Sequence, residues 1–178
     1  MDLGEYPELL DDLGPHAGEV LRASWTEASR VLSRTGLANY LRGAQALHAL
    51  GRGSDPVANF IQEAPAVARE VGEDVLADLV QGALAMASKT SGAVIALMLA
   101  TAPVAARRLG DAELFRAYLS FLGQLLAQAP RGVRPMLEQL EPLLGQLTLG
   151  GLRRWALWGA QAHRVDFAAQ ERYFSLTS

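Results

Sequence analysis

Apolar residues recur every three or four positions along most of the chain, and breaks in this spacing divide it into segments. Such a period is typical of helices that bury one face. The pattern predicts four helical hairpins. Their paired helices span about 16–33 with 37–50, 55–71 with 73–88, 93–109 with 112–128, and 133–147 with 152–167. With their turns, the hairpins cover about 16–50, 54–88, 92–128 and 132–167.

Two stretches of the chain repeat each other at an offset of 38 residues, Glu63–Asp74 and Thr101–Ala112. In both copies a glycine follows a proline by seven residues. Self-similarity at this period indicates stacked helical hairpins, each of which forms one unit of a larger array. The glycines predicted to turn the chain between paired helices are Gly36, Gly72, Gly110 and Gly150, at spacings of 36, 38 and 40 residues.

Interior prolines mark the first helix of three predicted hairpins, at Pro65, Pro103 and Pro142. A proline inside a helix removes a backbone hydrogen bond and kinks the helix. HEAT repeats resemble this pattern, because their first helix is often kinked by proline. Asp111 matches the aspartate expected after the turn of such a repeat, whereas Gly150 departs from it. We therefore expect an all-α fold, a HEAT-like right-handed stack of about four helical hairpins (an α-solenoid).

The predicted repeat domain, residues 16–167, is flanked by two shorter segments. Residues 1–15 form an acidic lead-in with room for a turn of helix around Glu8–Leu13. Residues 168–178 form a less regular tail, which we expect to lead to a further domain. The last hairpin and this tail are rich in aromatic residues and alanine, so we also expect something to cover that end of the stack.

The composition narrows the class of protein. Hydrophobic residues make up 50% of the 178 residues, enough for one folded domain with a proper core. The chain has no cysteine, which fits a reducing compartment. A net charge of −3 argues against a general nucleic-acid binder. The most apolar run, 93–106, is too short to span a bilayer, so it predicts a buried helix and a cytoplasmic protein.

No pattern of catalytic or metal-binding residues is present in the sequence. His16, His48 and His163 fall on three different predicted helices, without cysteine or acidic partners at ligand spacing. The glycine-containing stretch 51–54 lacks the lysine and the preceding strand of a phosphate-binding loop. We therefore expect no catalytic residue, no metal site, no cofactor and no enzymatic activity in this chain.

Two arginine pairs lie beside predicted turn glycines. Arg107 and Arg108 end a helix, where a positive charge suits the helix dipole, so a local role is one interpretation. Arg153 and Arg154 begin a helix, where the dipole disfavours cations, and this placement indicates an acidic partner outside the chain.

Two tryptophans, Trp155 and Trp158, follow the second arginine pair. Clusters of arginine and aromatic side chains are typical of protein interfaces. The alternative is that both indole rings pack in the last hairpin or against its next neighbour. On the first interpretation the sequence predicts a partner-binding surface. Its members are Arg107, Arg108, Arg153, Arg154, Trp155 and Trp158.

Several short stretches, spread over essentially the whole chain, resemble the N-terminal region of the CbbO/NorD family. They are Glu19–Trp25, Glu70–Asp74, Ala105–Asp111, Leu149–His163, Asp166–Phe167 and Tyr173–Leu176. The most specific of them is the run Gly-Leu-Arg-Arg-Trp at residues 151–155.

This resemblance implies a function. Members of the family are larger, carry a von Willebrand factor A domain and work with a MoxR-type AAA+ ATPase ring. In the CbbO branch the pair is a rubisco activase that removes inhibitory sugar phosphates, and in the NorD branch it assists maturation of nitric oxide reductase. The chain has neither the Asp-x-Ser-x-Ser motif of that domain nor a Walker motif, so the family's metal site is not carried over.

The resemblance therefore implies a non-catalytic adaptor that docks on a CbbQ-like ATPase hexamer, with rubisco engaged through the absent domain. It implies neither a nucleic-acid partner nor a membrane partner. It also implies a location in the cytoplasm or at the carboxysome. Two alternatives remain open besides the NorD branch. One is a scaffold whose helical ends self-associate, and the other is a small-molecule site in the apolar interior around Ala93–Leu99.

Overall fold

The computed structural model describes residues 3–148 and 150–155. Every regular element in these ranges is a helix, so the fold is all-α, as the sequence predicts. The elements are η1 (Leu3–Glu5), α1 (Pro7–Asp12), α2 (Gly14–Val31), α3 (Arg34–Ala49), α4 (Ser54–Val71), α5 (Val75–Met86), α6 (Gly92–Leu109), α7 (Ala112–Gln128), α8 (Pro130–Glu138) and α9 (Leu140–Gln146). Residues 150–155 are also helical.

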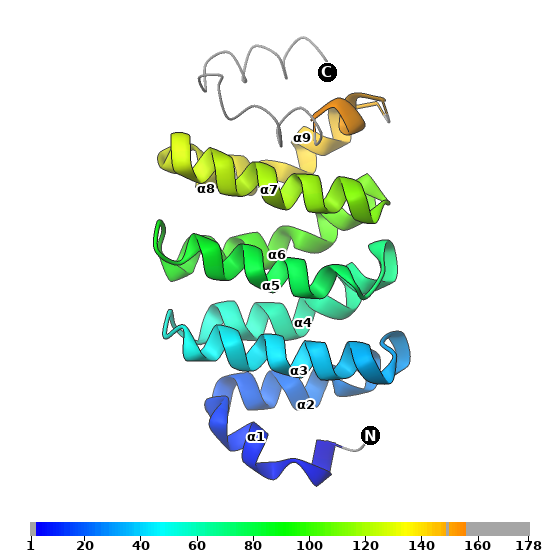
Figure 1. The fold of residues 1–178 in the computed structure, drawn as a ribbon, viewed down its shortest axis with the longest axis vertical. Coiled ribbons are helices and arrows are strands. Elements are labelled where there is room, and N and C mark those ends of the chain that lie inside the picture. Colours follow the sequence, from blue (N-terminus) through cyan, green and yellow to red (C-terminus); the bar gives the residue numbers. More distant parts are fainter. Residues whose placement is uncertain (1–2, 149, 156–178) are drawn as a thin grey trace.

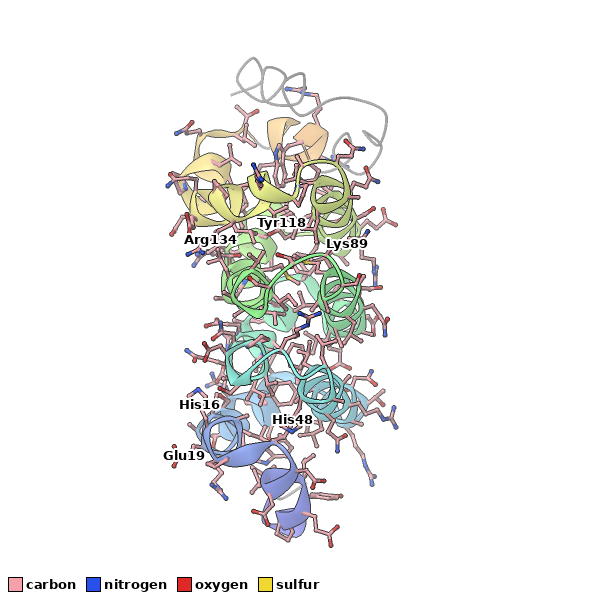
Figure 2. The ribbon with its side chains drawn as sticks, turned by 90° about the vertical axis from the view of Figure 1, so that its left-hand side faces the viewer. His16, Glu19, His48, Lys89, Tyr118 and Arg134 are labelled. Atoms are coloured by element: carbon pink, nitrogen blue, oxygen red, sulfur yellow. The ribbon has the colours of Figure 1, made fainter. Side chains whose placement is uncertain are left out.

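The helices lie in two layers along one long axis (Figure 1). Helices α2, α4 and α6 pack one on the next in the first layer, and α8 and α9 both contact α6. Helices α3, α5 and α7 form the second layer in the same way. Figure 2, which looks along the helices, shows the two layers side by side. The chain therefore runs from α1 at one end of the stack to α9 at the other (Figure 1).

The core lies between the two layers and is shared by successive hairpins. Helix α6 occupies its middle, and Ile95, Met98 and Leu99 have no exposed surface. By length and composition alone α6 could cross a membrane, with a mean hydropathy of 1.4. Half of α6 is buried inside the structure. A central helix of a folded core can be as long and as apolar as a membrane-spanning helix.

Two of the predicted interior prolines, Pro65 and Pro103, lie inside α4 and α6. Because proline has no amide hydrogen, the carbonyl four residues before it loses its helical partner. For Pro65 that carbonyl belongs to Ile61, and the buried hydroxyl of Tyr40 on α3 donates a hydrogen bond to it at 2.6 Å. Burial also raises the pKa of Tyr40, which keeps the hydroxyl protonated as a donor. The bond joins the first hairpin to the second.

The third predicted proline, Pro142, does not lie in the interior of one long helix. The expected helix 133–147 is divided into α8, which ends at Glu138, and α9, which begins at Leu140. The ring of Pro142 would clash with the carbonyl of Glu138 in a continuous helix. The chain breaks at Gln139 instead, which places the proline in the first turn of α9, where it is tolerated.

The turn glycines are only partly as predicted. Gly72 and Gly110 end α4 and α6 with φ values of 96° and 62°, a region that favours glycine. Gly150 is helical, so its predicted role is wrong. Gly36 lies in the first turn of α3, so the prediction of a turn there is also wrong.

A contact with Glu73 explains why glycine occupies position 36. A Cβ atom on Gly36 would lie 2.2 Å from the Glu73 carboxylate, which comes from the turn between α4 and α5. That carboxylate accepts hydrogen bonds from the backbone amide of Ser33, at 2.8 Å, and from its hydroxyl. The Ser33 hydroxyl oxygen in turn accepts from the amide of Gly36 at 3.1 Å and caps α3. One carboxylate thus ties the turns of two successive hairpins together.

Polar contacts also join helices of the same layer. The Asn59 side-chain amide on α4 donates to the Ala96 carbonyl on α6 at 2.9 Å. Asp78 on α5 pairs with Arg116 on α7 at 2.7 Å, and Glu27 on α2 pairs with Arg69 on α4. These contacts link specific residues of successive helices, and the two ion pairs among them are partly exposed to solvent, where such pairs add little stability.

Replacing Tyr40 by Phe should lower the free energy of unfolding by about 1–3 kcal/mol, because the Ile61 carbonyl would remain buried without a donor. Urea denaturation measures the loss, and Tyr6→Phe at an exposed ring is the control. In a Pro65→Ala background the new amide can serve the carbonyl, so Tyr40→Phe should cost less there. An equal cost in both backgrounds would contradict this role of the tyrosine.

Replacing Glu73 by Ala should lower the free energy of unfolding by about 1 kcal/mol, since both bonds to Ser33 are lost at a partly exposed site. The matched control is Glu70→Ala, an exposed glutamate near the end of α4. Thermal unfolding of the two variants compares them directly. If both behave alike, the link between the turns contributes nothing to stability.

Candidate protein-binding surface

The first predicted arginine pair lies in the last turn of α6, and both side chains are exposed. Their charge suits the negative end of the helix dipole. The guanidinium group of Arg108 lies 3.5 Å from the position that a Cβ atom on Gly145 would occupy. Arg108 therefore lies against α9, at the end of the stack farthest from α1 (Figure 1).

The second pair follows a capped helix start. The Thr148 hydroxyl accepts from the amide of Gly151 at 3.1 Å, and the Thr148 carbonyl accepts from Leu152 at 2.8 Å. Arg153 and Arg154 come directly after this turn and are exposed. The second pair thus follows α9 in the chain, whereas the first pair ends α6, with Arg108 beside Gly145 of α9.

These four arginines form no ion pair with any residue in the described part of the chain. Arg69, Arg116 and Arg134 are paired with Glu27, Asp78 and Glu138. Arg22 and Arg42, near the α1 end, are like the four arginines in forming no ion pair with described residues. The four unpaired guanidinium groups leave an excess of positive charge at the α9 end, which is suited to bidentate contacts with carboxylates.

Trp155 has the environment of a core residue. Its side chain is fully buried and stacks on Tyr118 with ring centroids 5.8 Å apart. It also meets Phe121 edge-on at 5.1 Å. The alternative interpretation, packing in the last hairpin or against its neighbour, therefore describes Trp155 better than direct contact with a partner, because both rings it meets belong to α7 of the preceding hairpin. Trp158 lies outside the described residues.

The buried Tyr118 is not arranged for proton transfer. Burial raises its pKa, and the nearby Thr101 partly opposes that rise. The Thr101 hydroxyl itself donates to the carbonyls of Leu97 and Met98, at 2.8 and 3.2 Å. A protonated phenol among apolar rings serves packing rather than acid–base chemistry.

Among the described residues, no group of three or more histidine, cysteine, aspartate or glutamate side chains lies close enough to hold a metal ion. His16 on α2 and His48 on α3 are exposed and line one hollow of about 480 Å³ (Figure 2). The sequence did not predict this proximity, because it depends on how the loop after α3 packs beside the start of α2. His163 lies outside the described residues.

A second hollow, of about 610 Å³, lies between α1 and α3 at the opposite end from the arginine pairs. Tyr6, Pro7 and Leu9 line it on one side and Leu41 and Gln45 on the other. Its remaining lining residues are Glu8 and Asp12 of the acidic lead-in. The sequence indicated the acidic character of this segment but not the hollow.

Comparison of the chain with protein-family models, curated proteins and solved structures found no match. The resemblance to the CbbO/NorD family therefore stays an expectation from the quoted stretches of sequence. The site residues stay predictions as well, and the structure places five of the six, all except Trp158.

Replacing Trp155 by Ala should lower the free energy of unfolding by about 3–5 kcal/mol, because a large ring leaves the core beside Tyr118 and Phe121. Trp25→Ala, at a half-buried position on α2, should cost clearly less. Urea denaturation followed by far-ultraviolet circular dichroism measures both. A loss at position 155 no larger than at position 25 would contradict the buried position of this ring.

Proposed function

We propose that this chain is a non-catalytic adaptor that docks on a MoxR-type AAA+ ATPase hexamer of the CbbQ type, as part of a rubisco activase. On this proposal the exposed arginine pairs at the α9 end contact acidic residues of the ring. Rubisco, the client enzyme, is engaged by a domain outside this chain. The adaptor works in the cytoplasm, free or associated with carboxysomes.

The arrangement of the helices supports an adaptor. Two layers of paired helices in chain order give an elongated surface with room for more than one partner. We propose that the stack belongs to the HEAT-like class of right-handed α-solenoids. The interior prolines Pro65 and Pro103, on successive helices of one layer, favour this assignment.

The observation that carries the docking proposal is the presence of two adjacent exposed pairs, Arg107 with Arg108 and Arg153 with Arg154, none of which forms an ion pair with a described residue. Two of them lie in the stretch most specific for the CbbO/NorD resemblance. Placing like charges side by side costs free energy, which an acidic partner would recover. Trp155, which follows Arg154 in the chain, anchors this segment in the core by packing against Tyr118.

Two alternatives share parts of this evidence. An adaptor for nitric oxide reductase maturation, as in the NorD branch, would use the same docking surface with a different client. A self-associating helical scaffold would use the ends of the stack. The unpaired arginines favour an acidic partner in each case, so the choice depends on which partner binds.

Co-migration of this chain with its cognate MoxR-type ATPase on size exclusion, with ATP present, tests the proposal. We expect a complex that Arg153→Glu with Arg154→Glu weakens about ten-fold or more, because attraction becomes repulsion. A second variant reverses Arg107 and Arg108 in the same way.

The matched control reverses Arg22 and Arg42, which are exposed near the other end of the stack. This control should bind like the unchanged chain. Equal binding by all variants would place the contact elsewhere on the stack. If a longer protein that contains this chain binds and the chain alone does not, the proposed docking role of the helical stack is wrong.

A further inference from the structure

Charge is distributed unevenly along the chain, so the two ends of the stack differ in net charge. Residues 1–90 carry thirteen acidic and seven basic side chains, whereas residues 91–178 carry six acidic and nine basic ones. The net charges of the two halves are therefore −6 and +3. Because the chain runs in order from one end of the stack to the other, the described part has an acidic and a basic end (Figure 1).

The acidic end has a hollow of its own, between α1 and α3. The Tyr6 ring on its edge is 42% exposed and is the most exposed large hydrophobic side chain in the described residues. Leu41, half-buried on α3, lies on the other side. The carboxylates of Glu8 and Asp12 are exposed beside these apolar groups and form no ion pair with described residues.

This combination fits a guanidinium group. Arginine presents a planar cation that pairs with carboxylates, stacks on aromatic rings and packs its aliphatic stem against apolar surface. The hollow offers each of these partners, in Glu8 and Asp12, Tyr6, and Leu41. A lysine would obtain the charge attraction but not the planar stacking.

The basic end of the same molecule carries such groups. Arg153 and Arg154 are exposed at the far end of the stack, and no described carboxylate neutralises them. A molecule with complementary ends can bind a copy of itself head to tail, with the hollow of one copy facing the arginines of the next. Such a contact leaves one hollow and one arginine pair free at the two ends, so it can continue.

We propose that the hollow between α1 and α3 receives Arg153 and Arg154 of a second copy of this chain. The occupant is a second copy because the complementary charge lies on the opposite end of the same stack. The contact is weak, reversible and sensitive to salt, since its charges lie at a solvated surface. It does not depend on the proposed ATPase partner, but it occupies arginines that the partner would need, so the two contacts compete.

Sedimentation velocity of the full chain over a range of about 5–500 µM tests this contact. At low ionic strength the weight-average sedimentation coefficient should rise with concentration. In about 0.5 M salt it should return to the monomer value, because screening removes the attraction. A monomer at every concentration at low ionic strength would overturn the proposal.

A charge exchange identifies the two surfaces. The hollow variant carries Glu8→Arg and Asp12→Arg, and the tip variant carries Arg153→Glu and Arg154→Glu. Alone, each variant sets like charges against each other in the head-to-tail contact, so each should stay monomeric. Mixed, they restore opposite charges at the contact between the two variants, and association should return.

The matched control reverses Glu70 and Glu113, exposed carboxylates that do not line the hollow, and it should associate like the unchanged chain. Circular dichroism checks that every variant keeps its helices. If the hollow variant loses helix, Glu8→Gln with Asp12→Asn replaces it and should still weaken association.

Association of the hollow variant at the level of the unchanged chain would overturn the proposal, as would a mixture that stays monomeric. These experiments use no ATPase, so their failure leaves the adaptor proposal untouched. Failure of the adaptor proposal would in turn leave the self-association intact.

Discussion

No hairpin in this chain can cover its own apolar surface, and the rest of the structure depends on that constraint. Helix α6 shows it most clearly, because its core-facing side chains are fully buried only through contacts with helices of neighbouring hairpins. Neighbouring hairpins therefore stabilise each other through the core that they share. The layers must also lie in register, which apolar packing alone does not guarantee.

The register between hairpins comes from polar groups whose hydrogen-bond partners lie in the neighbouring hairpin. In the clearest case, Pro65 leaves the carbonyl of Ile61 without its helical donor. The hydroxyl of Tyr40, on the preceding hairpin, donates to that carbonyl instead. Glu73 acts in a similar way at the turns, where it reaches back to Ser33 and lies so close to Gly36 that a larger residue there would displace its carboxylate. A slip of one hairpin would leave these groups without partners, at a cost of about 1–3 kcal/mol for each buried one.

The sequence predicted the all-α class and most helices, because the apolar period and the proline-to-glycine spacing are local signals. It was wrong where a side chain interrupts a helix within one turn, or where a side chain contacts a residue of another hairpin. The break at Gln139 follows from the clash of Pro142 with a carbonyl of the preceding turn. The role of Gly36 depends on Glu73, a contact across two hairpins, and the burial of Trp155 depends on α7. The hollow between α1 and α3 likewise has no local signature, whereas the arginine pairs are visible in the sequence itself.

The central functional claim is that the arginine-bearing end of the stack is a protein-docking surface. Hydrogen–deuterium exchange of this chain, alone and with the cognate ATPase hexamer and ATP, tests it most directly. The account predicts slower exchange of backbone amides in two segments, the end of α6 around residues 107–110 and residues 150–155, with little change on α3 and α5. Protection confined to other helices, or none at a saturating concentration of the hexamer, would contradict it.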